Sequence, residues 1–143
     1  MLAIVGPTGV GKTEFALRLA EEINAEIVNC DSRQIYQAMD IGTAKPTEKQ
    51  TKVVPHHLFN ICLPTESFDL HRYQNDAKIT VREITSRNKI PILVGGSGQY
   101  LWSVVENWDL GNVKPNYDLR KELEISASSI KGMSALVEEL KLN

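Results

Sequence analysis

The eight residues at positions 6–13 constrain the fold of this chain more than any other feature. They fit the pattern G-x-x-x-x-G-K-[S/T] at every fixed position, and they lie between the apolar stretch Leu2–Val5 and a helical pattern. In such a loop, backbone amides and a helix N-terminus surround a phosphate group. The lysine supplies a cation for phosphate oxygens, and the hydroxyl after it is suited to Mg²⁺. We therefore expect a di- or triphosphate to bind at Gly6, Pro7, Thr8, Gly9, Val10, Gly11, Lys12 and Thr13.

The remaining hydrophobic pattern predicts an α/β fold, with a P-loop NTPase-like parallel sheet flanked by helices. We expect Leu2–Val5 to be a fully apolar strand inside that sheet. Further strands are expected at residues 26–29, 57–62 and 90–94, and helices at 13–24, 69–87 and about 100–105. Asp69 is the predicted N-cap of the second helix. The polar segment 41–55 is expected to be an irregular, mobile functional loop.

The composition changes after Trp108, where the chain becomes more polar. Two helices are expected there, at residues 119–127 and 135–142, joined by a serine-rich link through Gly132. We therefore predict a phosphate-binding core at residues 1–112. Residues 113–143 are expected to begin a helical insertion whose apolar stripe needs a partner.

Composition excludes several classes of protein. Sixteen Lys and Arg against 18 Asp and Glu leave a net charge of −2, so a general electrostatic clamp on nucleic acid is excluded, although a local basic patch is not. No apolar run is long enough for a membrane span. Cys30 and Cys62 have no metal-site or redox spacing, and we expect both to be buried in a reducing compartment. The chain is therefore expected to be cytoplasmic.

Asp31 follows the second predicted strand, at the sheet edge where open α/β proteins bind ligands. A carboxylate there can accept a proton from an attacking nucleophile, but it can also simply cap a short turn. Arg33, Gln34 and Tyr36 are suited to holding a base or a phosphate, or they belong to an ordinary hydrated surface. A phosphate loop is used most often for phosphoryl transfer, so a small-molecule kinase remains a candidate at this point.

Beyond the loop, several blocks resemble the tRNA dimethylallyltransferases in order and spacing. The Met-Asp-Ile-Gly-Thr-Ala-Lys-Pro block at residues 39–46 is far more specific than a phosphate loop alone. The other matching blocks are Asp-Ser-Arg-Gln-Ile-Tyr at 31–36, Pro-His-His-Leu at 55–58 and Ile-Leu-Val-Gly-Gly-Ser-Gly-Gln-Tyr at 92–100. The resemblance covers roughly residues 3 to 120.

This resemblance implies transfer of a dimethylallyl group from dimethylallyl diphosphate to the exocyclic amine of the adenosine beside the tRNA anticodon. Lys12, Thr13 and Mg²⁺ would then stabilise the charge on the departing diphosphate. Asp31 would orient the amine and take its proton. The target base must leave its stack to reach the site. A kinase, or an enzyme that prenylates free adenine nucleotides, is the alternative.

The resemblance also implies tRNA contacts at Asp31, Ser32, Arg33, Gln34 and Ser97, with Arg120 as a further contact or a plain solvated position. The family usually has Thr at Ser97, and Ser keeps the hydroxyl. Family members are about twice as long as this chain, so we expect a fragment or a natural truncation. We expect it to be a monomer that does not contact membranes, binds diphosphate weakly and transfers little.

Overall fold

The computed structural model describes residues 1–111 and 115–142. The chain divides into two compact units, Met1–Asp109 and Leu110–Asn143. The predicted boundary between residues 112 and 113 lies outside the described residues. Within the described part, no helix has the length and apolar character needed to cross a membrane.

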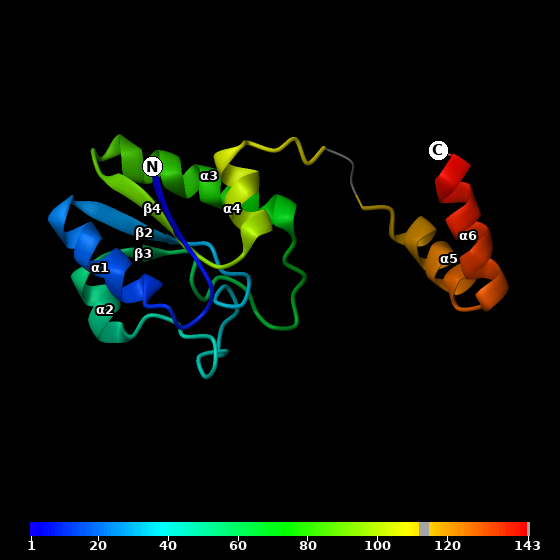
Figure 1. The fold of residues 1–143 in the computed structure, drawn as a ribbon, viewed down its shortest axis with the longest axis horizontal. Helices are drawn as coiled ribbons and strands as arrows, with labels where there is room; N and C mark the ends of the chain where they lie inside the picture. The colour runs from blue at the N-terminus through cyan, green and yellow to red at the C-terminus, as the bar shows by residue number, and fades with distance from the viewer. Residues whose placement is uncertain (112–114, 143) are drawn as a thin grey trace. The chain divides into compact units, whose positions relative to one another are not determined.

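The first unit is a four-stranded parallel sheet with helices on both faces. Its strands are β1 (Leu2–Val5), β2 (Ala25–Asn29), β3 (His56–His57) and β4 (Ile90–Gly95), in the spatial order β1-β4-β2-β3. Helices α1 (Lys12–Glu22) and α2 (Glu48–Val53) lie on one side, and α3 (Leu70–Ser86) and α4 (Gly98–Val105) on the other (Figure 1). The predicted α/β fold is therefore confirmed, together with its strand–loop–helix beginning.

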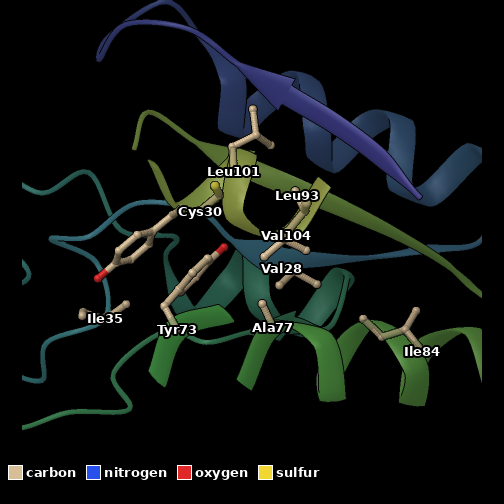
Figure 2. Packing of buried hydrophobic residues seen from close by; sticks show 10 residues of the cluster. Val28, Cys30, Ile35, Tyr73, Ala77, Ile84, Leu93, Leu101 and Val104 are labelled. Atoms are coloured by element: carbon tan, nitrogen blue, oxygen red, sulfur yellow. The ribbon is translucent and has the colours of Figure 1, made fainter. Parts of the chain in front are cut away.

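The two central strands bury side chains on both faces, as parallel strands between helical layers do. Val28 and Leu93 belong to the cluster under α3 and α4, whereas their neighbours Ile27 and Ile92 belong to the cluster under α1. Figure 2 shows the first of these clusters, with Ala77 of α3 directed at the sheet. The period-two alternation thus builds two cores from one sheet.

Helix α3 confirms its predicted start at Asp69. The side chain of Asp69 accepts a hydrogen bond from the backbone N–H of Arg72 at 2.8 Å, which is the N-cap contact expected from the sequence. Tyr73, Ala77 and Ile84 have no exposed surface. Their spacing of four and seven residues places them on one face of the helix, which packs against the sheet.

The position of β1 corrects one prediction. It was expected to lie inside the sheet, but it is an edge strand that pairs with β4 alone among the described strands. Leu2 is 43% exposed and Val5 is 54% exposed. An apolar run identifies a strand, but its place in the sheet depends on which other strands are present beside it.

The segment at residues 41–55 corrects a second prediction, because it contains helix α2. Thr47 and Gln50 form a capping box there: the Thr47 side chain accepts from the Gln50 backbone N–H, and the Gln50 side chain accepts from the Thr47 backbone N–H. The third strand is also shorter than predicted. It covers only His56–His57, and the expected pairing further along is reduced to one bridge between Tyr36 and Cys62.

The buried carboxylate of Glu26 links β2 to β3 and to the residues between α3 and β4. Glu26 is 3% exposed and lies 2.7 Å from Arg87, 3.2 Å from Lys89 and 2.6 Å from His57. Its hydrogen bond with Arg87 is the largest cause that lowers the pKa of Glu26 to about 2, against a smaller opposing effect of burial. The adjacent His56 bonds the Val54 carbonyl instead. Both histidines therefore have structural partners.

The second unit contains α5 (Tyr117–Ala127) and α6 (Ile130–Leu142). Neither helix has a buried residue among those described. The predicted serine-rich link is wrong, because Gly132 lies inside α6. A Cβ on Gly132 would lie 1.9 Å from the Ser126 carbonyl oxygen, so this glycine permits a close helix–helix approach where its sequence context indicated a linker.

Candidate functional site

A cavity of about 390 Å³ lies where the carboxyl ends of the parallel strands meet the loops that follow them. This is the edge of an open α/β sheet at which ligands bind. The phosphate loop follows β1, Asp31 follows β2, and Gly95 ends β4. The residues lining the cavity are Thr8, Gly9, Gly11, Lys12, Thr13, Glu14, Asp31, Gln34, Thr43, Ala44, Lys45, Gln50, Val94 and Gly95.

The phosphate loop leaves the first turn of α1 open to an anion. Gly11 is the N-cap of the helix with φ 87°, a left-handed conformation that favours glycine, and no side chain caps the helix. The first backbone N–H groups of α1 therefore lack the side-chain partner that caps many helices. The Lys12 ammonium donates to the Pro7 carbonyl at 2.7 Å, which holds its charge within the loop. These groups together suit a phosphate.

Asp31 is held by a turn that starts in the sheet. One of its carboxylate oxygens accepts from the Arg33 backbone N–H at 2.9 Å, and its own N–H donates to the side-chain oxygen of Asn29 at 2.9 Å. Asn29 is fully buried and also donates to the Leu58 carbonyl. The carboxylate is thus fixed by the backbone at the cavity wall, a position suited to accepting a proton.

Two serines tie the Asp31 turn to the start of α4. The Ser97 hydroxyl oxygen accepts from the Ser32 backbone N–H at 2.9 Å and donates to the Ser32 hydroxyl at 3.1 Å. The Ser97 N–H donates to the Cys30 carbonyl at 3.1 Å. Residues that are 65 positions apart in the sequence are therefore joined directly beside Asp31.

The thiol next to Asp31 is not a nucleophile. Cys30 has no exposed surface, and burial raises the pKa of its thiol to about 11, so it stays neutral near pH 7. Cys62 is also free and buried, and burial raises the pKa of its thiol as well. The prediction of two buried cysteines is confirmed.

Not every predicted site residue reaches the cavity. Thr8, Gly9, Gly11, Lys12, Thr13, Asp31 and Gln34 line it together, whereas Gly6, Pro7 and Val10 belong to the loop without lining it. Arg33 is exposed. Ser32 and Ser97 do not line the cavity and instead hydrogen-bond each other. Arg120 belongs to α5 in the second unit and lines an apolar groove there with Leu123 and Leu140.

The sequence interpretation missed a wall of the cavity. Thr43, Ala44, Lys45 and Gln50 come from the segment that was expected to be irregular. The signal that was available is the Thr-x-x-Gln spacing at residues 47–50, which is typical of a helix start. A helix at that point places the preceding residues in a constrained turn.

The same cavity offers an oxygen ligand that suits Mg²⁺, because Thr13, whose side chain carries a hydroxyl, lines it. Within the described ranges, no group of three or more His, Cys, Asp or Glu side chains forms a metal centre of its own. Mg²⁺ commonly takes one or two protein oxygens and completes its shell with phosphate and water. The donor set therefore fits an ion brought in with a diphosphate.

Comparison with known proteins gives consistent results. A family described as IPP transferase matches residues 34–142. The chain is 49% identical over 140 residues to a tRNA dimethylallyltransferase of Roseiflexus sp. (strain RS-1), covering 98% of this chain and 46% of that protein. It is 44% identical, with a TM-score of 0.76, to the crystal structure of a tRNA isopentenylpyrophosphate transferase from Bacillus halodurans. That match covers 97% of this chain and 46% of the other.

A third match is a eukaryotic dimethylallyltransferase acting on tRNA, at 32% identity and a TM-score of 0.71, covering 90% of this chain and 32% of that one. The chain thus spans less than half the length of the relatives it matches. The family match extends over most of the chain and includes the Asp-Ile-Gly-Thr-Ala-Lys-Pro block beside the cavity. On this basis the chain belongs to the IPP transferase family.

Proposed function

We propose that this chain forms the diphosphate-binding part of a tRNA dimethylallyltransferase. The observation that carries the proposal is that the phosphate loop, Lys12, Thr13 and Asp31 line one cavity at the ends of parallel strands. The names of its relatives support tRNA as the acceptor. A tRNA substrate also supports a cytoplasmic location, and we expect the chain to act as a monomer.

The proposed reaction breaks the bond between the dimethylallyl carbon and the diphosphate oxygen and forms a bond from that carbon to the exocyclic nitrogen of adenosine. The departing oxygen takes the electron pair, and the backbone N–H groups of the loop and the Lys12 ammonium stabilise the resulting negative charge. The amine loses one proton, which Asp31 accepts at its carboxylate. Mg²⁺, when bound through Thr13, would neutralise further charge on the diphosphate.

A binding measurement with inorganic pyrophosphate and Mg²⁺ distinguishes the role of Lys12 from that of Asp31. We expect Lys12→Ala to weaken binding at least about tenfold, because it removes a charged hydrogen-bond donor. Asp31→Asn should change it less than about threefold, since the variant keeps the side-chain size and removes a negative charge. Lys49→Ala is the matched control, because Lys49 is exposed on α2 and does not line the cavity. Equal losses for Lys12→Ala and Asp31→Asn would contradict this division.

Transfer is measured with labelled dimethylallyl diphosphate and an anticodon stem-loop RNA. We expect any label in the RNA to disappear with Asp31→Asn. Because the chain spans 46% of its relatives, we expect little transfer from these residues alone. Hydrolysis of ATP together with indifference to dimethylallyl diphosphate would instead favour a kinase.

A further inference from the structure

Lys45 lines the cavity, but its ammonium is fully used within the protein. Its side chain is 5% exposed, and it donates to the Tyr36 carbonyl at 2.5 Å, to Asn60 Oδ1 at 2.6 Å and to Asp40 Oδ1 at 2.9 Å. An ammonium group has three N–H donors, so these three acceptors satisfy it completely. Lys45 therefore fastens the segment at residues 36–45 to Asn60 and has no donor left for a phosphate.

The fastened segment fixes the side chain of Gln34. Gln34 Nε2 donates to the Thr43 carbonyl at 2.7 Å and to the Ala44 carbonyl at 3.2 Å. Both partners are acceptors, so the amide must turn its nitrogen toward them, which assigns its orientation. Within residues 1–111 and 115–142, no group donates to the side-chain oxygen, Oε1, so it remains an acceptor on a residue that lines the cavity together with Asp31.

The turn that supplies these carbonyls needs support from its surroundings. Ala44 has φ 52°, in the left-handed region that non-glycine residues rarely adopt. The Thr43 hydroxyl donates to the Met39 carbonyl at 2.6 Å, and Lys45 holds the next position. Because such a conformation persists only where surrounding contacts hold it, loss of the Lys45 ammonium should release the carbonyls that orient Gln34.

We propose that Lys45 is a positioning residue that orients Gln34, and that Gln34 Oε1 then selects the acceptor base by accepting an N–H of its exocyclic amine. This inference rests on the proposed function. An adenine amine has two N–H donors, one for Asp31 as the base and one for Gln34. Hypoxanthine carries an oxygen at the same position, which would face Gln34 Oε1 as a second acceptor, so the site should prefer adenosine over inosine.

The orientation is tested by NMR on the full chain, independently of activity. The Gln34 side-chain NH₂ signal is assigned by its absence in Gln34→Leu. We expect Lys45→Met, which removes the ammonium but keeps the apolar stem, to increase water exchange of that NH₂ group at least about tenfold. Lys49→Met is the matched control and should leave the signal unchanged. Unchanged Gln34 exchange in a folded Lys45→Met chain overturns the positioning role.

Base selection is tested by binding of two anticodon stem-loop RNAs, with adenosine or inosine at the target position, in the presence of pyrophosphate and Mg²⁺. The wild-type chain should prefer the adenosine RNA, and Gln34→Leu should reduce the preference by about fivefold, the value of one hydrogen bond. Lys45→Met should reduce it similarly, and the double variant no further, because both changes remove the same contact. If the double variant reduces the preference for the adenosine RNA by the product of the two single-variant factors, the inference that Lys45 acts through Gln34 is overturned.

Pyrophosphate binding separates this inference from the proposed function. A wild-type chain that fails to bind pyrophosphate contradicts the proposed function, while the NMR result still decides the role of Lys45. A wild-type chain that binds pyrophosphate without preferring the adenosine RNA overturns the role of Gln34. If Lys45→Met does not fold, Gln34→Leu alone tests the base selection. In the NMR test, Asn60→Ala, which removes one acceptor of the Lys45 ammonium, then replaces Lys45→Met.

Discussion

Strand β4 approaches the end of β2 so closely at Gly95 that no larger residue fits there. A Cβ on Gly95 would lie 2.0 Å from the Cys30 carbonyl oxygen and 2.7 Å from the Asp31 nitrogen, whereas ordinary contact begins at 3.4 Å. Gly95→Ala must therefore separate the two strands by about 1.4 Å, the difference between 3.4 and 2.0 Å. The atoms in the way are backbone atoms, so no side-chain rotation can relieve the clash.

The cost of that separation follows from the bonds around it. The Cys30 carbonyl accepts from the Ser97 N–H at 3.1 Å, and the Cys30 N–H donates to the Val94 carbonyl at 2.8 Å. Overpacking of this kind costs about 1–3 kcal/mol, and loss of the bond to Ser97 adds about 1 kcal/mol. We expect Gly95→Ala to lower the free energy of unfolding by about 3 kcal/mol. For the first unit, Met1–Asp109, that corresponds to a fall in Tm of roughly 13 °C.

The assay is thermal and urea unfolding followed by circular dichroism, with Gly96→Ala as the control. A Cβ on Gly96 meets only the Gly6 carbonyl oxygen at 3.5 Å, which is ordinary contact, so this variant should stay within about 1 kcal/mol of wild type. The close approach of β4 to Cys30 would be refuted if Gly95→Ala unfolds within about 2 °C of wild type. Equal destabilisation by both variants would show that the effect belongs to the glycine-rich turn as a whole.

Two further predictions concern the ion pairs of Glu26 and the N-cap of α3 at Asp69. The pKa of Glu26 is lowered to about 2 from an ordinary value near 4.5. Its ionised carboxylate therefore contributes fully to the free energy of unfolding above about pH 4.5, and this contribution is lost as pH falls through about 2. Urea midpoints measured across that range should fall for wild type and change much less for Glu26→Gln; parallel curves would contradict this. Asp69→Ala removes the N-cap of α3 and should cost about 1 kcal/mol, while Asp69→Asn, which keeps an acceptor oxygen, should cost less than half of that in the same unfolding assay.

Local features of the site were predictable from the sequence because their causes are local. The strand–loop–helix arrangement around residues 6–13 follows from an apolar run, a glycine-rich turn and a helical period in adjacent residues. Asp69 caps α3 through the N–H of a residue three positions away. The capping box at Thr47 and Gln50 was equally local and readable, and overlooking it led to the wrong expectation of an irregular segment.

The groups that complete the candidate site depend on contacts between distant residues. From the sequence, Lys45 is expected to be an exposed cation because it lies in a polar segment. In the structure its ammonium donates to Asn60, which is 15 residues further along the chain. Ser97 joins Ser32 across 65 residues, and Gln34 acquires its orientation from carbonyls nine and ten residues away. No local periodicity encodes such pairings, because they depend on how the loops after separate strands converge.

The phosphate loop was predictable because it follows from adjacent residues, and the α/β class and the family resemblance follow from the order of several such local blocks along the chain. The strand order β1-β4-β2-β3 was not predictable in this way; it puts the apolar β1 at an edge and brings the ends of β2 and β4 together. The physical reason is that strand pairing depends on long-range hydrogen bonds and packing, to which β1, β2 and β4 contribute similar apolar side chains. That order places Gly95 against Cys30 and so fixes where the Asp31 carboxylate lies at the cavity.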